Sequence, residues 1–510
     1  MQYMIGVDIG TTSTKAVLYT VEGEMMYQAH IEYPLHTPTV DISEEDPDEI
    51  VQAVKNTIKQ VIVAKGIQAN EIKFVALSAQ MHSLIIMDDD HHRLTNSITW
   101  ADNRAQIVAE RLKANNIQLY EKTGTPIHAM SPLSKILWFK EHQTNIFHRA
   151  SCFVDIKSYV LFQLTGRWVI DVSLASATGM MNLKTRQWDQ EILNLLNINS
   201  NQLPEIVPTT EQLWFKNQEI AQDLGLSQNT PIIVGASDGV LSNLGVNRFR
   251  KGEIALTIGT SGAIRTVVDE PIIDEAGRTF CYVLDESHYV VGGPVNNGAV
   301  VLRWLKEELL ASETETAKRL NKDSYALITE IAETVEPGAN GLLFHPYLTG
   351  ERAPLWTSDA RGSFIGLTLA HQKEHMIRAV LEGVILNLYS VFRALNEVID
   401  AQAFQISATG GFAKSALWRQ IVADIFDAQV DVPVEQESSC LGACVVGLKS
   451  IGEIDDYEIL NDWTETTYIH EPNKDNHQIY QQLVPIFDDI AQSLTHTYRE
   501  LAQFQRSKNH

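Results

Sequence analysis

Two glycine–threonine segments, one in each half of the 510-residue chain, limit most strongly what it can fold into. Residues 8–15 read Asp-Ile-Gly-Thr-Thr-Ser-Thr-Lys, and residues 257–262 read Thr-Ile-Gly-Thr-Ser-Gly. Each segment follows an apolar, strand-like run, at 3–7 and 253–256, and a further strand-like run comes after it. Both patterns predict a tight β-hairpin whose glycine allows the backbone to approach a ligand closely.

One such segment alone fits two interpretations, because ordinary hairpin turns also favour Gly, Ser and Thr. The duplication, and the acidic residue that begins the first copy, favour phosphate binding by backbone N–H and hydroxyl groups. The chain contains no G-x-x-x-x-G-K-[ST] loop, and no G-x-G-x-x-G opens a helix after the first strand. A dinucleotide-binding fold is therefore disfavoured, and we expect two domains that hold one polyphosphate.

Composition narrows the classes of partner. A net charge of −24 argues against nucleic acid and anionic membranes, so a phosphorylated ligand needs local donors and a metal ion. The N-terminus enters a strand pattern directly, and no apolar run reaches the ~20 residues of a membrane span, so we expect neither a signal peptide nor a membrane segment. Four cysteines are too few for a disulfide framework and are interpreted as buried thiols of a cytoplasmic enzyme.

The first 79 residues predict strand, turn, strand, turn, strand, helix and strand. The helix begins at Asp46-Pro47 and ends at Gly66, and the strand after it covers 74–77. This order is expected of a ribonuclease-H-like α/β domain, although periodicity alone supports only an α/β class.

The second half repeats the scheme less regularly. We expect a hairpin around Gly259, a strand at 289–291 ending in Gly292-Gly293, a helix over 299–310, a strand at 405–408 and a helix through Trp418 and Ile425. The polar connector 247–252 predicts a boundary between domains 1–246 and 247–510. A helical tail is expected from about residue 473.

Over nearly its whole length, the chain resembles the FGGY family of carbohydrate kinases, within the actin/hexokinase-like superfamily. Residues 130–142 (MSPLSKILWFKEH) resemble the family's first signature, and residues 362–367 with 375–382 resemble the second. The segments 78–83 (SAQMHS) and 99–105 (TWADNRA) are most similar to the gluconate kinase branch.

The resemblance implies an α/β fold of two ribonuclease-H-like domains with a cleft between them. It also implies an enzyme that transfers the γ-phosphate of ATP to a hydroxyl of an open-chain sugar acid, with D-gluconate giving 6-phospho-D-gluconate as the first expectation. A xylulose kinase, or another kinase of this family acting on a sugar or polyol, is the alternative within the class. An actin-like nucleotide switch or sugar sensor without catalysis is the alternative from another class.

Two aspartates are expected to carry the chemistry. Asp238 lies between an apolar strand and a helix, so it is either a helix N-cap or a proton acceptor, and the matching family aspartate is the catalytic base. Asp8 begins the first turn, where a carboxylate would repel phosphate unless a cation intervened. We therefore expect Mg²⁺ there, with an exposed strand-end aspartate as the alternative.

The remaining expected ligand residues follow from the resemblance. The phosphates and the nucleotide are expected to meet Thr11, Thr12, Lys15, Gly259, Thr260, Gly298, Gly411 and Ser415. The sugar is expected to meet Met81, His82, Asp102, Arg104 and Lys157, where His82, Arg104 and Lys157 are candidates for its carboxylate and Asp102 for its hydroxyls. Glycines at strand–helix turns are also ordinary caps, so Gly298 and Gly411 keep that alternative.

One lysine, one charged run and the partners of the chain remain to be interpreted. Lys135 lies in the 130–142 segment that resembles the first signature, which makes it a further candidate, and a helical lysine that extends its ammonium past Trp138 toward water is the alternative. The run 88–93 (DDDHHR) is interpreted as a solvated turn. The partners are expected to be a small-molecule sugar and ATP, with neither nucleic acid nor membrane, in a possible homodimer.

Overall fold

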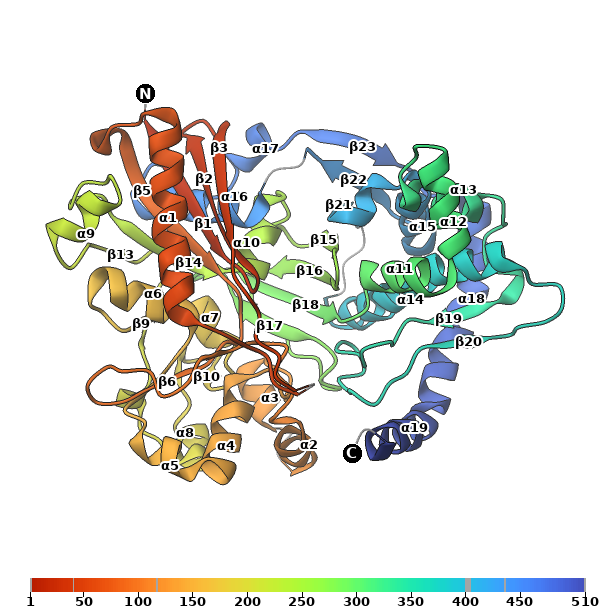
Figure 1. Cartoon of the computed structure of the whole chain (residues 1–510), viewed down its shortest axis with the longest axis horizontal. Helices are drawn as coiled ribbons and strands as arrows, with labels where there is room; N and C mark the ends of the chain where they lie inside the picture. Colours follow the sequence, from red (N-terminus) through yellow and green to blue (C-terminus); the bar gives the residue numbers. More distant parts are fainter. Residues whose placement is uncertain (1, 40, 116–117, 400–404, 435–436, 509–510) are drawn as a thin grey trace. The chain divides into compact units, whose positions relative to one another are not determined.

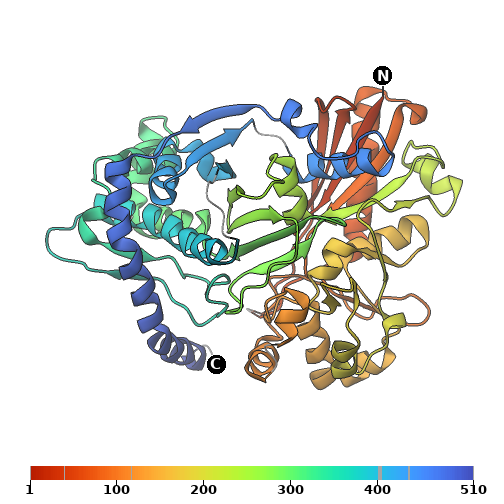
Figure 2. The same ribbon diagram turned by 180° about the vertical axis from the view of Figure 1, so that it is seen from behind.

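The computed structural model describes residues 2–39, 41–115, 118–399, 405–434 and 437–508 (Figures 1 and 2). They divide into two compact units: unit 1 is Met1–Phe249, Val268–Val290 and Gln436–Thr464, and unit 2 is Arg250–Val267, Val291–Glu435 and Glu465–His510. The single predicted boundary at 246/247 lies near the first crossing of the chain but misses the segments 268–290 and 436–464, which belong to unit 1. Periodicity carries no signal for such a return, because it depends on packing against residues far away in the sequence.

Unit 1 is built on a six-stranded sheet in the order β13-β14-β5-β1-β2-β3. The strands are β1 (Tyr3–Ile9), β2 (Ser13–Thr20), β3 (Met25–Glu32), β5 (Ile72–Ala79), β13 (Gln212–Leu213) and β14 (Ile232–Ser237). β1 pairs antiparallel with β2 and parallel with β5, and β5 pairs parallel with β14. The predicted order of three strands, a helix and a fourth strand is confirmed.

The helix α1 (Pro47–Lys65) begins and ends where the sequence predicts. The Asp46 side chain accepts a hydrogen bond from the Asp48 N–H, and Gly66 ends the helix with a left-handed φ of 65°. α1 packs against β1, β2 and β3, whereas α16 (Ser438–Ser450) packs against β1, β5 and β14. Figure 1 shows α1 in front of the sheet, and Figure 2 shows α16, in blue, on the opposite face. Coverage of both faces explains why β1 is apolar and buried almost throughout.

The packing of α16 requires glycine at close approaches. A Cβ at Gly442 would lie 2.2 Å from the Leu241 carbonyl oxygen of α10 (Asp238–Gly245), and a Cβ at Gly6 would lie 2.3 Å from the Cys440 carbonyl oxygen. In both cases the obstructing atom is backbone, which has little freedom to move. These contacts hold α16 against α10 and β1, and thereby fix the segment 437–444 beside the end of β1.

Unit 1 contains further helices and short strands outside this sheet. The helices are α2 (Gln106–Asn115), α3 (Gln118–Thr123), α4 (Pro132–His142), α5 (Thr144–Arg149), α6 (Ile156–Thr165), α7 (Val172–Ser176), α8 (Gln190–Leu196), α9 (Gln218–Asp223) and α17 (Leu460–Trp463), with 3₁₀ turns at Ala69–Glu71 and Ser200–Gln202. The short strands are β4 (Glu44–Glu45), β6 (Ile85–Met87), β7 (Ser97–Ile98), β8 (Cys152–Val154), β9 (Val169–Asp171), β10 (Met181–Asn182), β11 (Gln187–Trp188), β12 (Glu205–Val207) and β17 (Phe280–Val283).

Unit 2 contains the second predicted hairpin. Its consecutive strands are β18 (Tyr289–Val295), β16 (Gly262–Val268), β15 (Glu253–Ile258), β21 (Gln405–Thr409), β22 (Gln429–Pro433) and β23 (Thr466–His470). β15 pairs antiparallel with β16 and parallel with β21. The hairpin around Gly259 and the strand at 405–408 are thus confirmed.

Two boundaries in unit 2 differ from the prediction. β18 does not end at Gly292-Gly293 but continues to Val295. The glycine at 293 serves close packing and not a turn, because a Cβ there would lie 2.5 Å from the Val391 side chain of α14 (Lys373–Ile399). The helix expected over 299–310 is α-helical only in α11 (Ala299–Trp304) and continues as a π-helical segment, Leu305–Leu309.

The other elements of unit 2 are mainly helices. They are α12 (Ala311–Arg319), α13 (Ser324–Glu333), α15 (Ala416–Phe426), α18 (Lys474–Ser493) and α19 (Thr495–Lys508), with strands β19 (Leu343–His345) and β20 (Ser363–Ile365) and 3₁₀ turns at Ala339–Gly341 and Gly411–Lys414. α15, and the tail helices α18 and α19, confirm the predictions for those segments. Among the described helices α14 alone has the length and apolar character of a membrane span, and 78% of that stretch is buried inside the protein.

Gly442→Ala tests the close packing of α16. Alanine is the better helix former by about 1 kcal/mol, but its methyl group would overlap the Leu241 carbonyl, and overpacking costs about 1–3 kcal/mol. We expect a lower urea midpoint for unfolding, followed by fluorescence. Gly411→Ala is the control, because a Cβ there meets no atom within 4 Å. An unchanged midpoint in Gly442→Ala would contradict the packing described here.

Candidate functional site

The carboxyl ends of three parallel strands lie level at one edge of the unit 1 sheet. Asp8 of β1 is opposite Ser78 of β5, and Ser78 is opposite Ala236 of β14. The loops that leave these strands contain the first glycine–threonine turn, the 78–83 motif and Asp238. In open α/β sheets, ligands bind beyond the carboxyl ends of parallel strands. The topology therefore brings three separately predicted segments to one place.

Asp8 is partly buried and is the acidic group of the first turn. Its Oδ1 accepts a hydrogen bond of 2.7 Å from the Ser78 hydroxyl, and Lys15 lies directly opposite it on β2. Burial raises the pKa of Asp8 above its usual value, while the hydrogen bonds of Ser78 and Ser439 and the charge of Lys15 oppose that rise. The carboxylate is thus held in place by neutral and cationic partners.

Lys15 has a partner that the sequence analysis missed. Its Nζ donates to both carboxylate oxygens of Glu437, at 2.9 and 2.8 Å. Glu437 immediately precedes α16, and no local pattern links it to a lysine 422 residues earlier. Burial lowers the pKa of Lys15, but the hydrogen bond and the charge of Glu437 outweigh this and raise it. The ammonium beside the first turn therefore stays charged.

A chain of hydrogen bonds connects the first turn to the interior of unit 1. The Thr11 hydroxyl donates to Gln80 Oε1 and accepts from the Trp100 indole N–H, both at 2.9 Å. Gln80 Nε2 in turn donates to both carboxylate oxygens of the buried Glu45, at 2.9 and 2.8 Å. Burial raises the pKa of Glu45 to about 8. Thr11 is thus fixed by protein contacts, whereas Thr12 is exposed at the tip of the turn.

Asp238 is the first residue of α10, and the N-cap position belongs to Ser237. Its Oδ1 accepts a hydrogen bond from the Gly239 N–H at 2.6 Å. The strand end before it is fixed, because the hydroxyls of Ser237 and Ser173 lie 3.0 Å apart and Lys157 Nζ donates to the Ala236 carbonyl at 2.9 Å. The partly buried carboxylate therefore leaves the sheet edge from a rigid support.

Lys157 was expected to bind a sugar carboxylate, and the structure places it elsewhere. Its ammonium is 2.6 Å from Asp171, and the two side chains are 1% and 0% exposed. A buried cation in a low-dielectric interior needs such a partner. Since its charge is already balanced, Lys157 supports the end of β14 instead of offering a charge to a ligand.

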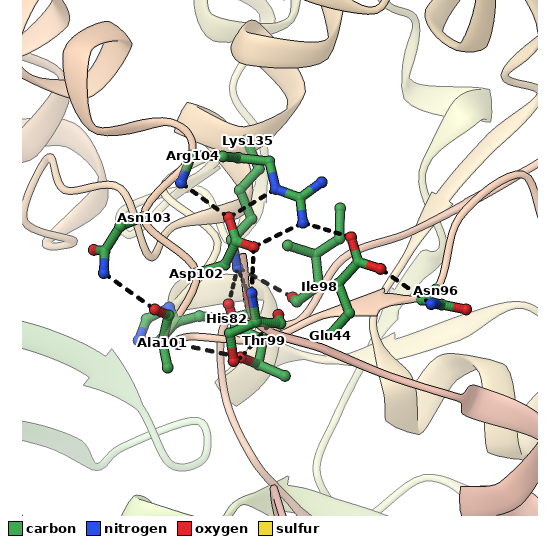
Figure 3. Close-up of polar contacts among 11 residues, drawn as sticks. Glu44, His82, Asn96, Ile98, Thr99, Ala101, Asp102, Asn103, Arg104 and Lys135 are labelled. Atoms are coloured by element: carbon green, nitrogen blue, oxygen red, sulfur yellow. Dashed lines mark hydrogen bonds and ion pairs between the residues drawn. The ribbon is translucent and has the colours of Figure 1, made fainter. Parts of the chain in front are cut away.

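Asp102 and Arg104 were also expected at the sugar, but they bind each other (Figure 3). Arg104 donates from Nε to Asp102 Oδ1 at 2.8 Å and from Nη2 to Oδ2 at 2.7 Å, and Nη2 also contacts Glu44 at 2.5 Å. The backbone N–H of Ser43 donates a further hydrogen bond to Oδ2 of the fully buried Asp102. The bidentate pair holds the 99–105 segment against β4, so its two charges are committed to the fold.

Met81 and His82 begin the loop after β5. His82 is 8% exposed and adopts a left-handed φ of 68°, which is rare outside glycine and asparagine. Its Nδ1 donates to the Ala177 carbonyl at 2.9 Å, and its ring meets Tyr282 edge to face with centroids 6.1 Å apart. The imidazole is therefore oriented from two sides, while Met81 is half-buried.

In unit 2 the second turn and the Gly298 loop lie against each other. Gly298 N–H donates to the Thr260 carbonyl at 3.2 Å, and Ala299 N–H donates to the Gly259 carbonyl at 2.7 Å. A Cβ at Gly298 would lie 2.4 Å from the Ser261 carbonyl oxygen. Glycine at 298 is thus required by this close approach, and the turn's carbonyls cap the start of α11.

The end of β21 adds the last predicted segment. A Cβ at Gly410, whose φ is 98°, would lie 2.4 Å from the Ile258 carbonyl oxygen, whereas one at the exposed Gly411 would meet no atom within 4 Å. Ser415 caps α15 by accepting the Trp418 N–H at 3.2 Å. Gly259, Gly298 and Gly411 are thus gathered at the carboxyl ends of the parallel strands β15 and β21.

The 88–93 run, which is rich in aspartate and histidine, is a surface turn. The 88–93 run has four exposed members at 89–92 and forms a turn closed by a hydrogen bond from the Asp88 N–H to the His92 carbonyl. Among the residues that the structure describes, no group of three or more His, Cys, Asp and Glu side chains is arranged to hold a metal ion.

Comparison with known proteins places this geometry in a family. Residues 3–245 match the N-terminal domain, and residues 254–451 the C-terminal domain, of the FGGY family of carbohydrate kinases. The gluconokinase of Bacillus subtilis (strain 168) is 52% identical over 506 residues, which cover 99% of this chain and 98% of the relative. The xylulose kinase of the same organism is 29% identical over 505 residues, covering 98% and 97%.

Solved structures agree on the fold. A gluconate kinase from Lactobacillus acidophilus superposes with a TM-score of 0.93 at 40% identity, covering 98% of this chain and 99% of that one. A ligand-bound structure described as a xylulose kinase from the same organism has the same TM-score and identity, covering 98% and 100%. Fold similarity alone therefore does not choose the sugar. The chain belongs to the FGGY family of carbohydrate kinases.

Proposed function

We propose that this chain transfers the γ-phosphoryl group of ATP to a hydroxyl of D-gluconate and forms 6-phospho-D-gluconate. The observation that carries the proposal is the common edge of β1, β5 and β14, where Asp8, the 80–82 segment and Asp238 emerge together. The 52% identity to the Bacillus subtilis gluconokinase supports gluconate as the acceptor.

Phosphoryl transfer to a sugar hydroxyl needs positioning, charge neutralisation and a proton acceptor. Asp238 accepts the hydroxyl proton in this proposal, and its rigid support at the end of β14 fixes where the acceptor hydroxyl has to lie. Lys15 and the N–H groups of the first turn neutralise charge on the transferring group, and Thr11 shapes that turn. Within unit 2, the turns that contain Gly259, Gly298 and Gly411 are the groups that this proposal assigns to nucleotide binding.

The residues at the first turn fit a magnesium ion. Mg²⁺ prefers hard oxygen ligands and is commonly held by one or two carboxylates together with substrate phosphates and water. Asp8 supplies such a carboxylate, and the scarcity of clustered ligands in the described ranges suits this mode better than an all-protein cage. A bound Mg²⁺ would screen the phosphate oxygens from Asp8.

Fewer side chains can bind the carboxylate of the sugar than the sequence suggested. Because Arg104 and Lys157 are paired with Asp102 and Asp171, His82 is the remaining candidate of the three predicted donors. We include in the proposal a homodimer in the cytoplasm, where the four free, buried cysteines Cys152, Cys281, Cys440 and Cys444 would stay reduced.

A coupled ADP-release assay tests the acceptor directly. Gluconate, D-xylulose, L-ribulose, glycerol and a no-sugar control are compared with ATP and Mg²⁺. We expect turnover with gluconate and little with the neutral sugars. Preference for D-xylulose would keep the kinase and contradict gluconate, and equal ADP release without any sugar would favour a nucleotide switch.

Asp238→Asn tests the proton acceptor. General base catalysis contributes about 10²–10⁴-fold, so we expect kcat with gluconate to fall by that factor while KM changes little. Asp89→Asn, in the exposed 88–93 turn, is the control and should behave as wild type. A loss of less than about threefold in Asp238→Asn would show that another group takes the proton.

A double-mutant cycle tests the pairing of Lys15 with Glu437. Loss of a group that stabilises the transferring charge costs about 10²-fold in kcat, which we expect for Lys15→Met. Glu437→Gln should cost less, about tenfold, and the double variant should resemble Lys15→Met because the two side chains act as a unit. The exposed pair Lys59–Asp223 is the control, and Lys59→Met should leave kcat unchanged. Additive losses would contradict the coupling.

A further inference from the structure

Lys135 is a buried cation. It lies in the first turns of α4 and its side chain is 0% exposed, so it does not extend its ammonium to water past Trp138. Burial of an uncompensated ammonium is costly, and burial lowers the pKa of Lys135 to about 7. The interior around it must therefore supply specific acceptors.

Three backbone carbonyls supply them (Figure 3). Lys135 Nζ donates to the carbonyl oxygens of His82 at 2.6 Å, Thr99 at 2.7 Å and Ile98 at 3.2 Å. An ammonium carries three N–H donors, so the three acceptors use its full capacity. In the part of the chain that the structure describes, no salt bridge to Lys135 is present, and backbone dipoles hold the charge.

These contacts join the segments that carry the family and branch resemblance. Lys135 belongs to the 130–142 segment, His82 to the 78–83 segment, and Thr99 to the 99–105 segment. The same 99–105 loop is fixed on its other side by the Asp102–Arg104 pair. The ammonium therefore ties together two loops whose adjoining residues Leu84 and Ile98 also exchange backbone hydrogen bonds, of 3.0 and 2.9 Å.

His82 is the member of this group with a strained backbone. A left-handed φ at a non-glycine residue costs about 1–3 kcal/mol and persists only where the surroundings impose it. The Lys135 ammonium holds the His82 carbonyl, and the Ala177 carbonyl holds its imidazole. The two contacts together set the direction of the ring.

We propose that Lys135 is a positioning residue for the sugar side of the site, which acts through the backbone of His82 and sets the affinity for the acceptor. This inference rests on the proposed function. Lys135 itself is enclosed by protein, so it does not touch the substrate. Its effect should appear in the binding of the sugar and not in the binding of ATP.

Lys135→Met tests this role, because methionine is of similar length but has no donor. We expect KM for gluconate to rise about 10- to 100-fold, while KM for ATP stays within about twofold. Lys140→Met is the matched control: it lies in the same helix, and its ammonium donates to a single carbonyl, Leu195 at 2.9 Å. The control should leave both KM values unchanged.

A second pair of measurements separates positioning from a general loss of structure. His82→Ala should raise KM for gluconate, and the Lys135→Met/His82→Ala double variant should be no worse than His82→Ala, because Lys135 acts through His82. If Lys135→Met does not fold, Lys135→Gln, which keeps one amide donor group, takes its place and should raise KM by an intermediate factor.

Two results would overturn the inference: an unchanged KM for gluconate in a folded Lys135 variant, or equal increases of KM for gluconate and ATP. Failure of the proposed function looks different, because wild-type protein would then phosphorylate a neutral sugar. In that case the same variants are compared on KM for that sugar, with the same expected pattern.

Discussion

The candidate site depends on the register of β1, β5 and β14, which brings the carboxyl ends of the three strands to one edge of the sheet. Asp8, Ser78 and Ala236 lie side by side across the three strands, so the loops beyond them begin at one edge whatever their own sequences are. A shift of one residue in any of these pairings would turn side chains to the other face of the sheet. Burial of both faces of β1, by α1 and by α16, makes such a shift costly and keeps Asp8 at the edge where β14 brings Asp238.

Buried cations then hold the loops beyond these strands. Lys157 supports the end of β14 through Ala236, and Arg104 holds the 99–105 segment through Asp102. Lys135 joins the 78–83 and 99–105 segments through backbone carbonyls. Each charge is matched by carboxylates or carbonyls, as the low-dielectric interior requires. The loops are thereby fixed before any ligand arrives, and a site held in this way loses less conformational entropy on binding.

Local features were predictable from the sequence, and long-range pairings were not. Asp46, Pro47 and Gly66 mark the ends of α1 because capping depends on neighbouring residues, and the two glycine hairpins follow from turn chemistry for the same reason. Lys157, Arg104 and Lys135 were assigned to a ligand or to the surface because a sequence shows a charge but not its partner. Asp171, Glu44 and the three carbonyls emerge only in the folded chain. The pairing of Lys15 with Glu437, which lies 422 residues away, could not be predicted for the same reason.

The most direct test of the account is the identity of the product. The product formed from gluconate, ATP and Mg²⁺ is examined by NMR, where couplings from phosphorus to neighbouring protons and carbons show which hydroxyl carries the phosphate. We expect one phosphoester, at the terminal hydroxyl of gluconate, formed in equal amount with ADP and formed about 10²–10⁴-fold more slowly by Asp238→Asn. Inorganic phosphate as the main product, or a phosphoester formed only from a neutral ketose, would contradict this expectation.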